Sequence, residues 1–227
     1  MQSKTTMAGT DAVEARQLLR AAIPTHLPTN PAADRPARAL AAVGQASPLP
    51  APLIADLRTD HAGETGAVMI YRGILAITRD PSLRHFAQQH LATESDHLAQ
   101  IEALLKQRQR SLLLPLWRVA GWLTGALPAL LGPRAVYATI EAVETFVDHH
   151  YAEQIASIEH LDPGGQQPAL QSLRGLLQRC RSDEIAHRDE AAQLFSEAGQ
   201  APSGPLRLWV GMVGAGSRGA VKICRRI

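Results

Sequence analysis

The feature that most constrains the fold is a repeated pair of residues, a glutamate followed three positions later by a histidine. The pair occurs as Glu94 with His97 and again as Glu184 with His187. On an α-helix, side chains at positions i and i+3 lie on one face. Each pair can therefore bind a single ion if its segment is helical.

One further glutamate precedes each pair on a separate stretch of chain. Glu64 comes before the first pair and Glu144 before the second, so the order Glu, Glu-x-x-His occurs twice. A glutamate from each of two helices, with Glu-x-x-His from each of two others, is typical of ferritin-like bundles that bind two iron or manganese ions. Carboxylate and imidazole suit these ions, whereas thiolates would indicate zinc or an iron–sulfur cluster.

The periodicity of the chain predicts an all-α fold. Ala and Leu are abundant and aromatic residues make up only 4% of the chain, which favours helices over strands. Helical spacing of apolar residues, without strand-like alternation, predicts a four-helix bundle. The expected helices are residues 53–77, 81–109, 134–160 and 168–198.

Each candidate ligand interrupts an apolar stripe at helical spacing. In the first helix, for example, Glu64 lies in line with Leu57 and Val68. Four buried carboxylates need cations, and two metal dications would largely cancel their charge. The alternative is that these residues lie on solvated helix faces, which explains neither the apolar stripes nor the single glutamates between the pairs.

The other segments divide the chain into two parts. Residues 1–50 contain repeated prolines and few large apolar groups, so we expect a mobile leader. Residues 51–227 form the predicted bundle. The formal net charge of +2 gives no reason to expect nucleic-acid binding, and the N-terminus lacks the apolar stretch of a secretory signal.

Two apolar segments outside the four helices are candidates for membrane contact. Residues 112–131 are long enough to span a bilayer, but Pro115, Gly121, Gly125 and Pro128 interrupt them. We expect an interfacial or re-entrant helical hairpin, with a hairpin that caps the core as the alternative. Residues 205–227 combine apolar and basic residues, typical of an amphipathic segment on an anionic membrane. The alternative is a C-terminal helix packed on the bundle.

The chain resembles the demethoxyubiquinone hydroxylase family of ubiquinone biosynthesis from about residue 55 to residue 227. All six candidate ligands occur in the matching motifs. These motifs are DHAGE at 60–64, ESDH at 94–97, EAVE at 141–144 followed by HHY at 149–151, and DEIAH at 183–187.

The resemblance implies a mono-oxygenase that hydroxylates the ring of demethoxyubiquinol with O2, using two iron ions. It assigns one iron to Glu64 and His97, the other to Glu144 and His187, and places Glu94 and Glu184 between them. An isoprenoid quinol substrate implies a peripheral enzyme at the cytoplasmic face of the cell membrane. A homo-oligomer or a complex with other ubiquinone-biosynthesis proteins is compatible with this function.

Residues next to the ligands are candidates for supporting them. Metal-bound histidine usually donates its other nitrogen to a carboxylate, and Asp60 and Asp183 are the candidate acceptors. His150 and Tyr151 follow Glu144 by one to two turns and could hydrogen-bond a ligand or the substrate. For all of these, the alternative is an ordinary polar residue on a helix surface.

The sequence leaves other functions and the source of electrons open. A different ferritin-like hydroxylase, or an iron-storage or ferroxidase protein, would share the ligand pattern. No Gly-x-Gly-x-x-Gly motif indicates a nicotinamide site of the Rossmann type. Electrons could come from the quinol, from a loosely bound nicotinamide or from a partner protein.

Overall fold

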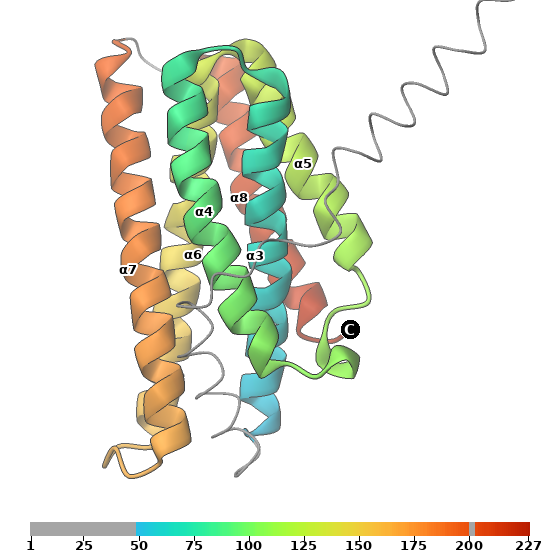
Figure 1. The fold of residues 1–227 in the computed structure, drawn as a ribbon, viewed down its shortest axis with the longest axis vertical. Helices are drawn as coiled ribbons and strands as arrows, with labels where there is room; N and C mark the ends of the chain where they lie inside the picture. Colours follow the sequence, from blue (N-terminus) through green and yellow to red (C-terminus); the bar gives the residue numbers. More distant parts are fainter. Residues whose placement is uncertain (1–48, 200–202) are drawn as a thin grey trace, which may run out of the picture. The chain divides into compact units, whose positions relative to one another are not determined.

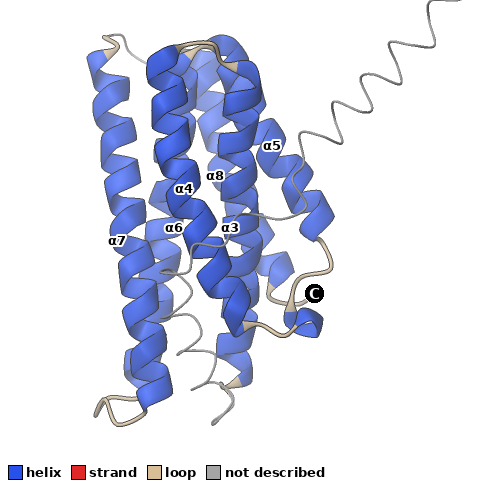
Figure 2. Cartoon of the chain, in the orientation of Figure 1, coloured by secondary structure: helices blue, strands red, loops and turns tan. Residues whose placement is uncertain are grey.

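The computed structural model describes residues 49–199 and 203–227, and helices dominate them (Figure 2). No strand occurs in these two ranges. The helices, labelled as in Figure 1, are α3 (Ala51–Ile77), α4 (Pro81–Leu104), α5 (Leu114–Leu131), α6 (Pro133–Leu161), α7 (Pro168–Glu197) and α8 (Gly204–Cys224), with a short 3-10 helix at Gln107–Gln109.

Four long helices form the expected ferritin-like bundle. Helix α3 packs against α4, and α6 packs against α7 (Figure 1). Contacts of α3 with α6 and of α4 with α7 join these two pairs. The remaining helices, α5 and α8, both pack against α3 and α6. The all-α fold class predicted from the sequence is confirmed, and the observed bounds of the four long helices lie close to those expected.

Prolines begin the described helices. Each of the six α-helices within residues 49–199 and 203–227 has a proline at its first or second position, where the missing N–H would have no partner inside the helix. At the start of α4, the Asp80 carboxylate also accepts a hydrogen bond from the Leu83 N–H at 2.7 Å.

The prediction of a helical hairpin at residues 112–131 is wrong, because residues 114–131 of this segment form the single helix α5. Its glycines allow close packing and do not make a turn. A Cβ atom on Gly125 would collide with the Ile70 carbonyl of α3, and one on Gly121 would collide with the Gly66 backbone. Pro115 begins the helix, and Pro128 lies within its last turn, where it removes one backbone hydrogen bond without dividing the helix.

Helix α8 packs on the bundle and does not extend away from it. The Trp209 indole donates a hydrogen bond to the Thr139 hydroxyl of α6 at 2.9 Å. At the other end of α8, the Arg225 guanidinium lies 2.6 Å from the Asp56 carboxylate of α3. The C-terminal segment therefore follows the packed alternative, although Leu208 and Met212 still face solvent.

The outward face of α5 is apolar. Leucine or valine side chains recur along it at helical spacing and stay exposed: Leu112, Leu116, Val119, Leu123, Leu127, Leu130 and Leu131. We call this set the α5 face. Among the helices that the structure describes, none has both the length and the hydrophobicity needed to cross a bilayer. The predicted leader lies almost wholly outside the described residues.

Two apolar clusters occupy opposite ends of the bundle core, and a polar layer lies between them. One cluster contains Leu57 of α3 and Leu177 of α7, and the other contains Ile74 of α3 and Ala191 of α7. Along each of the four long helices, the glutamate or Glu-x-x-His pair falls between residues of the two clusters. The core therefore shields this polar layer on both sides.

Substitution of Gly125 by alanine should destabilise the protein by about 1–3 kcal/mol, because the added methyl group overpacks the contact between α3 and α5. Urea unfolding followed by circular dichroism measures this loss. The matched control is Gly63→Ala in α3, where an added Cβ meets nothing within 4 Å. The control should raise stability by up to about 1 kcal/mol through helix propensity. Equal effects at both positions would contradict the proposed role of Gly125.

Candidate metal centre

All six predicted ligands meet in the polar layer. Their ligand atoms form two overlapping groups, and within each group the atoms lie within 4.8 Å of one another. The first group comprises Glu64, Glu94, His97 and Glu184, and the second comprises Glu94, Glu144, Glu184 and His187. Glu94 and Glu184 belong to both groups. This is the arrangement that two neighbouring ions with shared carboxylates require.

Several atoms of this cluster are buried without hydrogen-bond partners. They include one carboxylate oxygen each of Glu64, Glu94 and Glu184, together with Nδ1 of His187. Nδ1 of His187 lies 3.0 Å from a Glu94 oxygen, yet the two atoms lack the alignment of a hydrogen bond. A buried polar atom without a partner is costly, and a bound cation would satisfy all of these atoms together. The residues therefore fit a pair of metal ions.

Without metal, the carboxylates would limit their mutual repulsion by holding protons. Burial raises the pKa of Glu64 to about 7, and burial together with nearby carboxylates raises the pKa values of Glu94 and Glu144 well above their usual range. Burial would also raise the pKa of Glu184, but the nearby imidazoles of His187 and His97 lower it to about 2. One ionised glutamate therefore lies among carboxyls that tend to stay neutral.

Two tyrosines link the two halves of the duplicated pattern, which are the helix pair α3 and α4 and the helix pair α6 and α7. The Tyr151 hydroxyl of α6 donates a hydrogen bond to Glu64 of α3, and the Tyr71 hydroxyl of α3 donates to Glu144 of α6 at 3.2 Å. Each tyrosine follows the glutamate of its own helix by seven residues, which is two helical turns. The duplicated pattern therefore extends beyond the ligands, with each half supplying a hydroxyl to the other half.

Asp183 and Asp60 behave differently, although the sequence proposed the same role for both. The Asp183 carboxylate lies 3.0 Å from Nε2 of His97, on the side of the ring that faces away from the cluster. Asp60 is buried, and its contacts in the described structure are with His150, at 3.2 Å, and with the Gln154 amide. Asp60 therefore supports its neighbours on α6, whereas Asp183 can orient a ligand.

His150 lies beside the cluster and not in it. Its Nε2 atom is 3.0 Å from the Thr59 hydroxyl and 2.8 Å from the Gln154 amide nitrogen. Its ring stacks against Phe146, with an interplanar angle of 9°. These contacts give His150 a fixed orientation at the junction of α3 and α6, without direct contact to a candidate ligand in the described residues.

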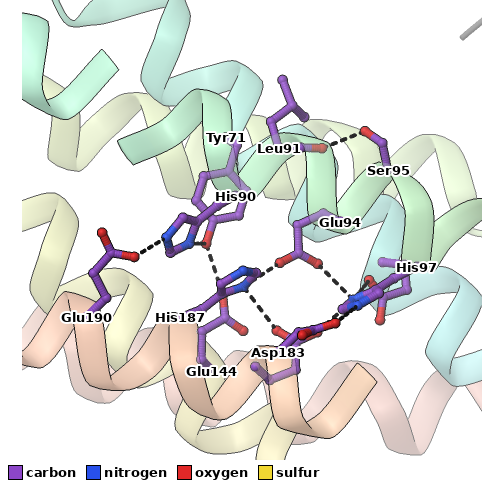
Figure 3. A network of polar contacts seen from close by, with 12 residues as sticks. Tyr71, His90, Leu91, Glu94, Ser95, His97, Glu144, Asp183, His187 and Glu190 are labelled. Atoms are coloured by element: carbon purple, nitrogen blue, oxygen red, sulfur yellow. Dashed lines mark hydrogen bonds and ion pairs between the residues drawn. The ribbon is translucent and has the colours of Figure 1, made fainter. Parts of the chain in front are cut away.

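Three further residues lie in or beside the centre and were not assigned from the sequence: Tyr71 and His90, which contact ligands, and Glu190, which contacts His90. Nδ1 of His90 lies 3.1 Å from the Tyr71 hydroxyl, and its Nε2 lies 2.9 Å from a Glu190 oxygen (Figure 3). The repeated seven-residue spacing from glutamate to tyrosine was a signal that identifies Tyr71. His90 and Glu190 lie one turn from ligands on their own helices, but nothing in their spacing separates them from other polar residues.

Comparisons with known proteins identify the family of the chain. A family model described as ubiquinone biosynthesis protein COQ7 matches residues 53–224. The chain is 38% identical over 184 residues to the 3-demethoxyubiquinol 3-hydroxylase of Rhodospirillum rubrum, which covers 79% of this chain and 81% of that protein. It is 35% identical over 173 residues to the NADPH-dependent 3-demethoxyubiquinone 3-hydroxylase, mitochondrial, of Homo sapiens. This match covers 75% of this chain and 76% of the human protein.

The metal-free protein should lose stability as the pH rises from about 5 to 8. Glu64 has an ordinary pKa of 4.5, which folding raises to about 7. Its protonated form therefore contributes stability that is fully present below pH 4.5 and is lost as the pH rises through 7. The raised pKa values of Glu94 and Glu144 act in the same direction.

Thermal unfolding of chelator-treated protein across this pH range measures the effect. Glu64→Gln should flatten the dependence, because the amide does not titrate. A midpoint that rises with pH in the unsubstituted protein would contradict the electrostatic description of the centre.

Proposed function

Because the chain belongs to the family of ubiquinone biosynthesis protein COQ7, we propose that it is the di-iron mono-oxygenase that hydroxylates the ring of 3-demethoxyubiquinol with O2. The observation that carries the proposal is the buried cluster of four carboxylates and two imidazoles, several of whose atoms have no partner. The names of relatives identify the reaction, and the cluster supplies the means to perform it.

The proposal assigns two iron ions to the cluster. Glu64 and His97 would bind one ion, Glu144 and His187 the other, and Glu94 and Glu184 would be shared. Bound iron would supply the activation of O2, which no protein side chain can provide. A bundle with only carboxylates and imidazoles as ligands suits iron, although manganese accepts the same ligands.

The chain's own residues would protect and orient the centre. All six ligands are buried, with exposures of 8% or less. The apolar clusters on either side of the polar layer exclude water, which would otherwise compete for the ions and weaken their attraction to the carboxylates. The Tyr71 and Tyr151 hydroxyls hold Glu144 and Glu64 in place by hydrogen bonds from the opposite half.

A quinol substrate with an isoprenoid tail would bring the enzyme to a membrane. The α5 face supports this proposal, because its seven exposed leucine or valine side chains, six on α5 and Leu112 just before it, form an apolar surface that water solvates poorly. We propose a peripheral position, at the cytoplasmic face of the cell membrane, with the α5 face against the lipid. Basic residues at the C-terminal end of α8, among them Lys222 and Arg226, would favour anionic headgroups.

The electron source and the partners of the chain are further parts of the proposal. The names of several relatives include dependence on NADPH, which favours a reduced nicotinamide over the quinol as the donor. Assembly with itself or with other proteins of ubiquinone biosynthesis remains part of the proposal.

Expression of the chain in cells that lack their own demethoxyubiquinone hydroxylase should convert the accumulated demethoxy intermediate into ubiquinone. Mass spectrometry of extracted quinones measures the conversion. Glu184→Ala should abolish it, because this carboxylate belongs to both ligand groups. Glu153→Gln, on the exposed surface of α6, is the matched control and should keep full conversion. Continued accumulation of the intermediate with folded, iron-loaded protein would contradict the proposed substrate.

Leu123→Glu combined with Leu127→Glu on the α5 face should reduce binding to anionic lipid vesicles by about tenfold or more, because each buried leucine contributes about 1.5–3 kcal/mol. Vesicle flotation of the purified protein measures the bound fraction. Leu161→Glu is the control, since this leucine is equally exposed but lies at the end of α6. Unchanged flotation of the α5 variant would mean that another surface meets the membrane.

A further inference from the structure

The two ligand groups are supported differently on their outer sides. In the first group, Nε2 of His97 has the Asp183 carboxylate at 3.0 Å. The residue that corresponds to Asp183 in the duplicated pattern is Thr93, which directly precedes Glu94 just as Asp183 precedes Glu184. Threonine offers no carboxylate, so the second histidine, His187, lacks the counterpart of this contact.

His90 packs against the ring face of His187. The two imidazole rings stack, with centroids 3.9 Å apart and an interplanar angle of 26°. The residue that corresponds to His90 in the other half is Cys180, four residues before Glu184. Each ligand histidine therefore has one supporting side chain that the other does not: the Asp183 carboxylate beside His97 and the His90 imidazole beside His187.

The position of His90 is fixed at both ring nitrogens. Nδ1 lies 3.1 Å from the Tyr71 hydroxyl, which itself donates to the ligand Glu144. Nε2 lies 2.9 Å from the carboxylate of Glu190, which is about half exposed at the surface of α7. A continuous chain of polar contacts thus runs from Glu190 through His90 and Tyr71 to Glu144, and it passes beside His187 (Figure 3).

The residues of this chain belong to different helices. Tyr71 is on α3, His90 on α4 and Glu190 on α7, while the ligand Glu144 is on α6. His90 is 2% exposed, and it also packs against Phe86 with ring centroids 4.1 Å apart. Because packing from several helices immobilises the imidazole, the ring can fix the orientation of its neighbours.

We propose that Tyr71, His90 and Glu190 are positioning residues for the second metal site only, the site of Glu144 and His187. The proposal rests on the proposed function, since it presumes that the cluster binds two ions. The hydroxyl of Tyr71 fixes the Glu144 carboxylate, and the stacked ring of His90 fixes the plane of the His187 imidazole. Asp183 and Tyr151 perform these tasks for the first site, through His97 and Glu64.

Cobalt(II) binding to single-site proteins tests this division. His97→Ala should leave only the second site, and His187→Ala only the first. Tyr71→Phe, which removes one hydroxyl, and His90→Leu should each weaken cobalt binding in the His97→Ala protein by roughly 10- to 100-fold, the usual effect of losing an outer contact. Neither should change the affinity of the His187→Ala protein. The visible absorption of bound cobalt and calorimetric titration give the affinities.

Tyr151→Phe is the matched control, because Tyr151 makes the corresponding hydrogen bond in the other half. It should weaken the site in the His187→Ala protein and spare the other. If a single-site protein binds no cobalt, each tyrosine substitution is instead made in a chain that keeps both His97 and His187, and that chain is titrated with cobalt. Tyr71→Phe must then weaken one of the two binding events, and Tyr151→Phe the other.

The outcomes separate this proposal from the proposed function. If Tyr71→Phe or His90→Leu weakens both sites alike, or neither, the positioning role is overturned while the two-metal centre stands. A general loss of packing would give that equal weakening, together with reduced helical content. If the unsubstituted chain binds no divalent metal at all, the proposed function fails and the positioning role fails with it.

Discussion

The structure depends on the placement of four glutamates in the interior of a helical bundle. Buried carboxylates repel one another and lose their hydration, so an apolar core tolerates them only with protons or with cations. The high pKa values of Glu94 and Glu144 favour protonated carboxyls when no metal is bound. The cluster oxygens without hydrogen-bond partners are the atoms that cations would satisfy. Metal binding would release these protons, so the affinity for metal should increase with pH.

The duplicated pattern explains how the bundle brings these groups together. The polar layer receives equivalent groups from the two helix pairs. Helices α3 and α6 each supply a glutamate, and α4 and α7 each supply a Glu-x-x-His pair. The tyrosines cross between the halves, so each half needs the other to satisfy its glutamate. This mutual dependence couples the packing of the two helix pairs to the geometry of the centre.

Sequence periodicity predicted the four long helices and the six ligand positions because both follow from local spacing on a helix. It did not predict α5, because a glycine such as Gly125 has the same letter whether it makes a turn or allows a close helix contact. It also assigned Asp60 the same role as Asp183. Which of the two carboxylates reaches a ligand histidine depends on the rotation of α3 and α7 about their axes, and that rotation is set by packing between distant segments.

The central claim is that this cluster holds two iron ions. The most direct test is a Mössbauer spectrum. The protein is first reconstituted anaerobically with isotopically labelled iron(II) and is then exposed to O2. The account predicts two iron ions per chain and the spectrum of an exchange-coupled pair, absent from the Glu184→Ala protein. A folded chain that retains no iron, or only isolated ions with the same spectrum in both proteins, would contradict it.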